Sequence, residues 1–198
     1  FLHAIVTGRT DTDPAQSLRG FIKRPPIDHA KAWKAGDLKT FKERLGGFKG
    51  NRTTHLALEL MMLTFVRTAE LRNAEWTEFD LERRLWSIPA QKMKMRRTHI
   101  VPLSRQAMAT LGELKQITGN GRYLFPNTRR PNACMSGTTL NRAIEYLGYP
   151  SGYWLGHDFR ATAKTHLLEQ GWSEGVTEAQ LAHAPRGQTA AAYNHAVY

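Results

Sequence analysis

Cysteine is nearly absent from this sequence of 198 residues, which has a single thiol at Cys134. One cysteine excludes an internal disulfide framework and is typical of proteins of the reducing cytosol. No histidine or cationic side chain stands recognisably beside Cys134 in the sequence. We therefore interpret it as an incidental residue rather than a nucleophile, and we expect a cytoplasmic protein.

Long apolar runs are also missing, because none approaches the roughly 18 residues that a membrane-spanning helix needs. The longest, Leu56 to Val66, is interrupted by Glu59 and Thr64 and is expected to form a core helix. The first residues, FLHAIV, are too few for a signal peptide and lack its basic start. We expect no membrane partner. The chain begins without Met and inside a helix-like pattern, so we expect a fragment.

Several signatures of cofactor and metal chemistry are absent. There is no G-x-x-x-x-G-K-[ST] phosphate loop, and Gly46–Gly47 and Gly119–Gly121 are interpreted as turns. No paired carboxylates indicate a two-metal site, and the histidines lack the spacing of zinc ligands. We expect a protein that works without a cofactor and without a metal.

Acidic residues are few relative to basic ones, with 17 Asp and Glu against 28 Lys and Arg and a net charge of +11. This excess favours a polyanionic partner, most often nucleic acid and less often an anionic membrane surface. The shares of hydrophobic and charged residues, 41% and 23%, are those of an ordinary folded protein.

The pattern along the chain predicts a mainly α protein with a small three-stranded antiparallel β-sheet. Glycines and prolines punctuate residues 1 to about 25, which are interpreted as a helix end followed by a linker. Alternating apolar residues predict strands around Phe79, Trp86 and Val101, with the segment QKMKMRR as an exposed turn. Helical periodicity predicts helices over 34–45, 51–73, 104–117, 138–147, 158–169, 177–183 and 188–197. Thr177 and Gln180 have the spacing of a capping box.

Two pairs of polar residues could carry chemistry. His157 and Arg160 lie three residues apart at a predicted helix start, where backbone N–H groups and the helix dipole favour an anion. The alternative is that Arg160 pairs with a carboxylate and His157 only packs. Arg67 and Glu70 are usually a solvated surface pair at this spacing, but Arg67 follows an apolar run and so is expected on a half-buried surface.

The basic turn and Tyr193 can each be interpreted in two ways. Lys92, Lys94, Arg96 and Arg97 could keep a sheet edge soluble or could touch a DNA backbone. Tyr193, in TAAAYNHAVY, is a prominent residue that in isolation would be assigned to a core or its rim.

The combination of these residues in one order resembles the catalytic domain of the tyrosine recombinases, in the prophage integrase subgroup. The segments that carry the resemblance are LTFVRTAELRNAEWTEFDL, WSIPAQKMKMRRTHIVPLS, HDFRATAKTHLLEQG and LAHAPRGQTAAAYNHAVY. The resemblance implies the fold of that catalytic domain over residues 26–198. It also implies that residues 1–25 are the tail of a missing core-binding domain with its linker.

The resemblance further implies a role for each residue of the boxes. Arg67 and Arg160 would bind the non-bridging oxygens of the scissile phosphate, and Lys94 would protonate the departing 5′ oxygen. His157 would contact the phosphate or assist proton transfer, and His183 would hydrogen-bond the same phosphate. Tyr193 would be the nucleophile that forms a 3′-phosphotyrosyl bond, and Glu70 would orient its neighbours. Lys92, Arg96 and Arg97 would add DNA contacts.

The implied function is site-specific cleavage and rejoining of double-stranded DNA for integration or excision of a prophage or genomic island. Members of the family act as tetramers on DNA, sometimes with accessory DNA-bending proteins, although this fragment could be a monomer. The alternatives are a type IB topoisomerase, a DNA-binding module that no longer cleaves, and a basic structural protein. Two residues depart from the usual boxes: Phe65 and Ala182 stand where glycine is common.

Overall fold

A computed structural model describes residues 1–18, 20–21, 32–152, 156 and 158–183. The short helix α1 (Leu2–Val6) and the 3-10 turn η1 (Gln16–Leu18) contain no buried residue. No helix of the described ranges is long and apolar enough to cross a membrane. The predicted helix over 188–197 lies outside the described residues.

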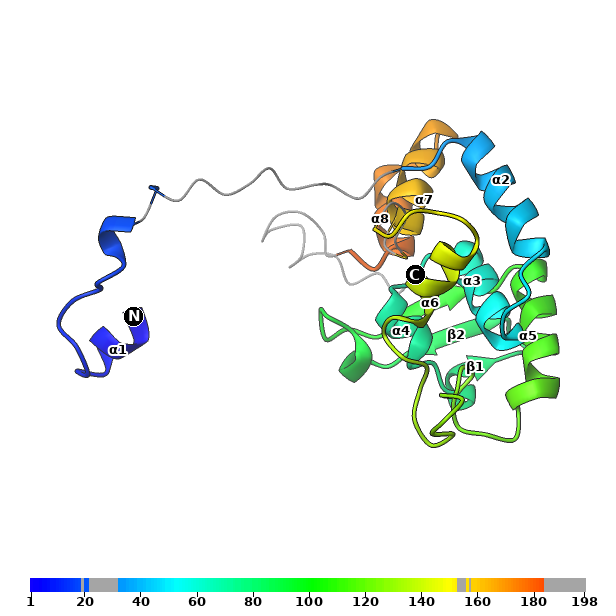
Figure 1. Cartoon of the computed structure of the whole chain (residues 1–198), viewed down its shortest axis with the longest axis horizontal. Helices are drawn as coiled ribbons and strands as arrows, with labels where there is room; N and C mark the ends of the chain where they lie inside the picture. The colour runs from blue at the N-terminus through cyan, green and yellow to red at the C-terminus, as the bar shows by residue number, and fades with distance from the viewer. Residues whose placement is uncertain (19, 22–31, 153–155, 157, 184–198) are drawn as a thin grey trace.

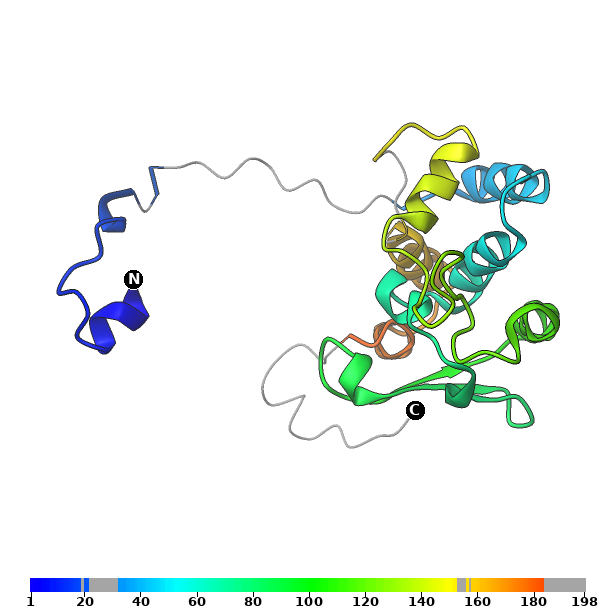
Figure 2. The ribbon, with the colours of Figure 1, turned by 60° about the horizontal axis from the view of Figure 1, so that its bottom comes forward.

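Helix α3 (Arg52–Thr64) occupies the middle of the folded body, with α2 (Ala35–Gly46) and α7 (Asp158–Glu169) towards one end and the sheet towards the other (Figures 1 and 2). Leu56, Leu58, Leu60 and Met61 of α3 are at most 1% exposed. The helix packs against α5 (Arg105–Thr118) and α6 (Thr139–Tyr146). This central helix is therefore buried on nearly all sides, as its apolar sequence predicts.

The sheet has the predicted three antiparallel strands in the order β1 (Phe79–Asp80), β2 (Leu85–Ile88) and β3 (His99–Pro102). Trp86 pairs with Val101, and Ile88 pairs with His99. All four of these side chains are at most 8% exposed, because alternate residues of a strand point to the same face. The mainly helical fold with one small sheet is confirmed.

The prediction of one helix over 51–73 was wrong. Helix α3 ends at Thr64, Phe65 takes a left-handed conformation with φ of 56°, and a separate helix α4 (Thr68–Arg72) follows. Apolar residues continue through the break, since Val66 and Leu71 are buried, so the hydrophobic pattern does not reveal it. The start of this helix was predicted correctly. Asn51 is its N-cap residue, and the Asn51 side chain accepts a hydrogen bond from the Thr53 N–H at 2.8 Å.

The predicted capping box at Thr177 was also wrong. Helix α8 (Glu174–Gln180) begins one turn earlier, and its N-cap is Ser173, whose side chain accepts from the Val176 N–H. Thr177 is inside the helix and fully buried, and its hydroxyl donates to the Ser173 carbonyl at 3.1 Å. A threonine can satisfy its hydroxyl in this way within a helix, so the side-chain spacing alone does not locate the start.

Candidate active site

Arg67 owes its position to the break after α3. It is the N-cap residue of α4, and its Nη1 lies 2.7 Å from Oε1 of Glu70. The other carboxylate oxygen of Glu70 accepts from the Arg67 backbone N–H at 2.8 Å. Glu70 is 3% exposed. A cation at a helix start opposes the helix dipole, and the buried carboxylate offsets that repulsion while it fixes the guanidinium.

Arg160 lies in the first turn of α7 and is 3% exposed. Its Nη1 donates to the Phe65 carbonyl at 2.7 Å, and its Nη2 donates to the Leu181 carbonyl. The same Nη2 lies 3.1 Å from Nε2 of His183. Burial and then the nearby charge of Arg67 lower the pKa of Arg160 to about 10, so the guanidinium remains charged at neutral pH. Its Nε has no partner within the described residues.

Two helix C-termini face these guanidinium groups. The C-cap residue of α3 is Phe65, with φ of 56°, and α8 is followed by Ala182, with φ of 49°. The Ala182 carbonyl lies 3.5 Å from Nη2 of Arg67. Carbonyls at helix C-termini lack partners within the helix and attract cations. The two residues that replace a common glycine therefore stand at left-handed positions, for which glycine is the favoured residue.

His183 follows α8 and contacts Nη2 of Arg160, whereas the Phe65 carbonyl binds Nη1. Its Nδ1 lies 2.5 Å from Oε2 of Glu178. Its backbone N–H donates to the Glu178 carbonyl at 2.9 Å. The structure thus brings Arg67, Arg160 and His183 together from three segments of the chain, with Glu70 paired to Arg67.

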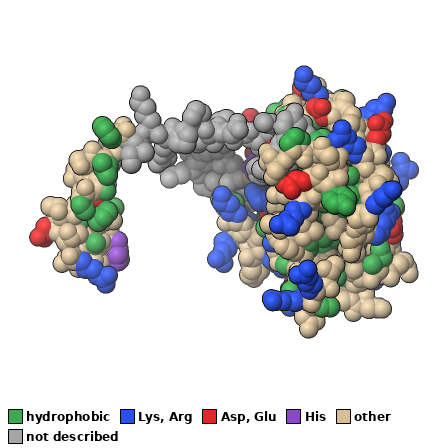
Figure 3. Space-filling model, in the orientation of Figure 1, with side chains coloured by type: hydrophobic (Ala, Val, Ile, Leu, Met, Phe, Trp, Pro, Cys, Tyr) green, Lys and Arg blue, Asp and Glu red, His purple; other side chains and the backbone are tan. Residues whose placement is uncertain are grey.

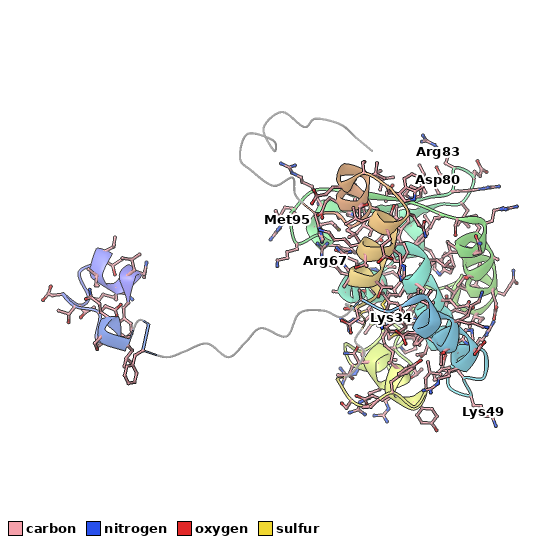
Figure 4. All side chains as sticks on the ribbon, turned by 90° about the horizontal axis from the view of Figure 1, so that it is seen from above. Lys34, Lys49, Arg67, Asp80, Arg83 and Met95 are labelled. Atoms are coloured by element: carbon pink, nitrogen blue, oxygen red, sulfur yellow. The ribbon has the colours of Figure 1, made fainter. Side chains whose placement is uncertain are left out.

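The hairpin between β2 and β3 presents its basic residues differently. Lys94, Arg96 and Arg97 are exposed, and Lys94 has no hydrogen bond or ion pair within the described residues. Figure 4 shows neighbouring Met95 at the margin of the body on the side of Arg67. Among the described residues, the hairpin therefore presents the ammonium group of Lys94 without a partner.

Lys92 does not share this exposure. Its ammonium donates to the Asn73 carbonyl at 2.7 Å and pairs with Glu75 at 2.7 Å and with Glu78. Burial alone lowers the pKa of Lys92, but the hydrogen bonds to the two carboxylates outweigh it and raise the pKa. The geometry favours a role in anchoring the hairpin to the end of α4 over the DNA contact expected from the sequence.

His157 and Tyr193 lie outside the described residues, so the site is described without them. The sequence analysis missed three residues at the site: Glu178, Lys164 and His99. His99 on β3 is 8% exposed, and its Nε2 is unpartnered within the described residues. Burial lowers the pKa of His99, and the charges of Arg160 and Arg67 add to this against the opposing effect of Glu70. Strand alternation could have placed His99 inside with Val101.

Chemically, the described groups have the charge and the donors to bind an oxyanion such as phosphate. Each guanidinium group can donate to phosphate oxygens, and a histidine adds a further donor or acceptor. Their positions are fixed by carbonyls and carboxylates before any ligand arrives. Such prearranged charges stabilise the additional negative charge that develops when a phosphate is attacked.

The sequence matches the family described as "Phage integrase family" over residues 38–198. The integrase of Enterobacteria phage P4 is 39% identical over 207 residues, covering 98% of this chain and 47% of that protein. Prophage integrase IntA of Escherichia coli K12 is 32% identical over 197 residues, covering 100% of this chain and 48% of that protein. The chain therefore spans about half the length of the curated relatives it matches.

Solved structures share the fold at low sequence identity. A Tn1549 transposon integrase in complex with a circular intermediate DNA has a TM-score of 0.73 and 13% identity, covering 100% of this chain and 72% of that chain. A lambda integrase tetramer bound to a Holliday junction has a TM-score of 0.68 and 19% identity, covering 95% and 56% of the two chains.

Proposed function

The chain belongs to the phage integrase family of tyrosine recombinases, and from this premise we propose that it is the catalytic part of a site-specific DNA recombinase. It cleaves and rejoins double-stranded DNA through a 3′-phosphotyrosyl intermediate, in the integration or excision of a prophage or genomic island. The observation that carries this proposal is the convergence of Arg67, Arg160 and His183 on one anion site. The net charge of +11 supports a nucleic-acid substrate.

The proposed reaction is a transfer of the phosphoryl group without net loss of a phosphodiester bond. The phenol oxygen of Tyr193 attacks phosphorus, the bond from phosphorus to the 5′ oxygen breaks, and Lys94 gives that oxygen a proton. Arg67 and Arg160 hold the non-bridging oxygens, while His183 and His157 contact the phosphate or move the phenol proton. Attack by a 5′ hydroxyl on the phosphotyrosine reverses the steps, so neither a high-energy cofactor nor a metal is needed.

The arrangement on DNA is proposed by comparison. Lambda integrase forms a tetramer on a Holliday junction, and we propose a homotetramer on DNA for the protein of which this chain is a part, with possible roles for DNA-bending proteins. Residues 26–198 are proposed as the catalytic domain, and residues 1–25 as the tail of a core-binding domain and a linker. The basic side chains over the visible face of the body suit contact with phosphates (Figure 3). We place the protein on DNA in the bacterial cytoplasm.

The test is covalent attachment to DNA in EDTA. Nicked duplexes with randomised arms would be incubated with the wild-type chain, Tyr193→Phe and the matched control Tyr198→Phe, and adducts separated on denaturing gels. We expect adducts with the wild type and Tyr198→Phe and none with Tyr193→Phe. The wild type and the same two variants would also be prepared in a longer protein that includes a core-binding domain. Absence of any adduct from both lengths would overturn the enzyme in favour of a DNA-binding module that no longer cleaves.

A further inference from the structure

A carboxylate and a lysine stand behind His183 on the side away from Arg160. Glu178 in α8 has a side chain that is 17% exposed, and each of its oxygens has its own partner. Oε1 accepts from the ammonium of Lys164 on α7, and Oε2 faces Nδ1 of His183 at 2.5 Å. The chain Lys164–Glu178–His183–Arg160 therefore links two helices to the anion site.

The partners of the His183 ring determine where its proton lies. A carboxylate can only accept hydrogen bonds, so the Nδ1 atom facing Glu178 carries a proton. A guanidinium can only donate, so the Nε2 atom at 3.1 Å from Arg160 presents its lone pair. These two partners together favour the tautomer that carries its proton on Nδ1. Free imidazole side chains favour the opposite tautomer, so this one is imposed by the neighbours.

We propose that Glu178, held by Lys164, is a positioning residue that fixes His183 with Nδ1 protonated and reserves Nε2 for the phosphate and the proton transfers at the site. The catalytic meaning of this assignment rests on the proposed function, whereas the tautomer can be measured without DNA. In the neutral ring and in the imidazolium alike, the Nδ1 proton stays on the bond to Glu178. Proton exchange is therefore confined to Nε2.

The charge of Glu178 supports this role. Burial raises the pKa of its carboxyl, but the hydrogen bonds from Lys164 and His183 outweigh burial and leave the pKa below its usual value. Glu178 is therefore an anion at neutral pH. An anion at this place also compensates a positive charge on the ring when Nε2 takes up a proton and donates to a phosphate oxygen. Arg160, which contacts the ring, also interacts electrostatically with Arg67, Glu70 and Glu178.

The first experiment measures the tautomer in the wild-type chain. Long-range proton–nitrogen NMR spectra distinguish protonated from unprotonated ring nitrogens, and a His183→Asn spectrum identifies the signals of His183. We expect Nδ1 protonated and Nε2 unprotonated at neutral pH. An Nε2–H tautomer, or a rapidly exchanging mixture of the two, would overturn the proposal without recourse to any variant.

The second experiment uses an isosteric change. In Glu178→Gln, Lys164 still requires an acceptor, so the amide oxygen turns to Lys164 and the amide NH₂ turns to His183. The ring must then accept at Nδ1 and carry its proton on Nε2, opposite a guanidinium that also donates. We expect inversion of the tautomer and loss of about 10–100-fold in single-turnover adduct formation, by analogy with the partners that orient metal-binding histidines.

A second substitution should rescue the first. Lys164→Met added to Glu178→Gln removes the ammonium, and the amide can then flip to offer its oxygen to His183. We expect the Nδ1–H tautomer and at least several-fold of the rate to return. The matched control is Glu169→Gln, because exposed Glu169 lies 3.3 Å from Nδ1 of His166 on α7, away from the site. It should change neither the His183 signals nor the rate.

The outcomes separate this proposal from the proposed function. If Glu178→Gln retains the Nδ1–H tautomer and the wild-type rate, Glu178 is not a positioning residue. If the rate falls but the double variant does not recover, the loss is one of packing and the proposal is also overturned. If no wild-type protein forms an adduct, the proposed function fails, and the tautomers of the wild type and the Glu178→Gln variant still decide whether Glu178 positions His183.

Discussion

At the scale of single residues, Arg160 has a structural role in addition to the functional one that we propose for it. Its guanidinium joins the carbonyl of Phe65 to the carbonyl of Leu181, and these belong to the ends of two different helices. The planar fork of arginine reaches both acceptors while it faces His183. A lysine at this place would bring one ammonium group, which cannot span the same acceptors and also keep a donor for a phosphate.

We therefore predict that Arg160→Lys lowers the single-turnover rate of adduct formation by about 10²–10³-fold, as expected when a donor to the developing charge is lost. The free energy of unfolding should fall by about 1–3 kcal/mol, because a buried carbonyl loses its donor. Quenched time courses on nicked duplexes measure the rate, and urea titrations measure the free energy of unfolding. Arg105→Lys, at an exposed position in α5, is the control. An unchanged rate in Arg160→Lys would remove Arg160 from the phosphate site.

The site residues differ in how visible they are in the sequence. Arg67, Arg160 and His183 stand in distinctive boxes, and the structure brings them together. Glu178 and Lys164 could not be assigned in this way. Glu178 lies five residues before His183, with the end of α8 between them, so helical spacing does not predict their contact. Lys164 reaches Glu178 only because α7 and α8 pack together.

At the scale of elements, the left-handed residues at helix ends are the features that periodicity cannot detect. The break at Phe65 divides the predicted helix over 51–73, because a single residue with positive φ redirects the chain while the apolar pattern continues. The strands and their antiparallel order were predictable because alternation and short turns determine them. Ala182 repeats the left-handed turn after α8 and directs two carbonyls towards the arginines.

We predict that Ala182→Gly raises the free energy of unfolding relative to a matched substitution in the helix. A left-handed conformation costs a non-glycine residue about 1–2 kcal/mol, and glycine relieves that cost. Ala179→Gly, inside α8, should instead lose about 1 kcal/mol of helix stability. Urea denaturation of the two variants and the wild type gives the comparison. If Ala182→Gly lowered the free energy of unfolding as much as Ala179→Gly does, the turn at Ala182 would not be strained.

The base of the hairpin gives a prediction on pH. Hydrogen bonds from Arg122 and then Lys92 lower the pKa of Glu75 to about 2. The folded pKa lies below the unfolded value of about 4.5, so this carboxylate stabilises the fold above about pH 4.5. The stabilisation is lost as the pH falls from there towards 2. In Glu75→Gln, the unfolding free energy should therefore decline less steeply over that range.

Unfolding titrations in urea at several pH values between about 5 and 2 measure this slope. The control is Glu82→Gln, an exposed residue of the turn between β1 and β2. If Glu75→Gln retains the full slope of the wild type, the ion pairs of Glu75 with Arg122 and Lys92 do not form as the structure has them.

At the scale of the whole molecule, the net charge suits the substrate that we propose. The chain has 28 basic and 17 acidic residues, an excess that favours a polyanionic partner, and it shares its fold with solved integrase structures. The described part of the chain holds the groups that would bind the phosphate. The nucleophile was assigned from the sequence alone, because Tyr193 lies outside the described residues.

The measurement that tests the central claim most directly is the identity of the linked residue and of the linked DNA end. Adducts formed in EDTA would be digested with trypsin, and the DNA-bound peptide would be analysed by mass spectrometry. The account predicts the peptide that follows Arg186, with DNA attached through a 3′ phosphate to Tyr193 and a free 5′ hydroxyl on the other strand end. Attachment to any other residue, or through a 5′ phosphate, would contradict it.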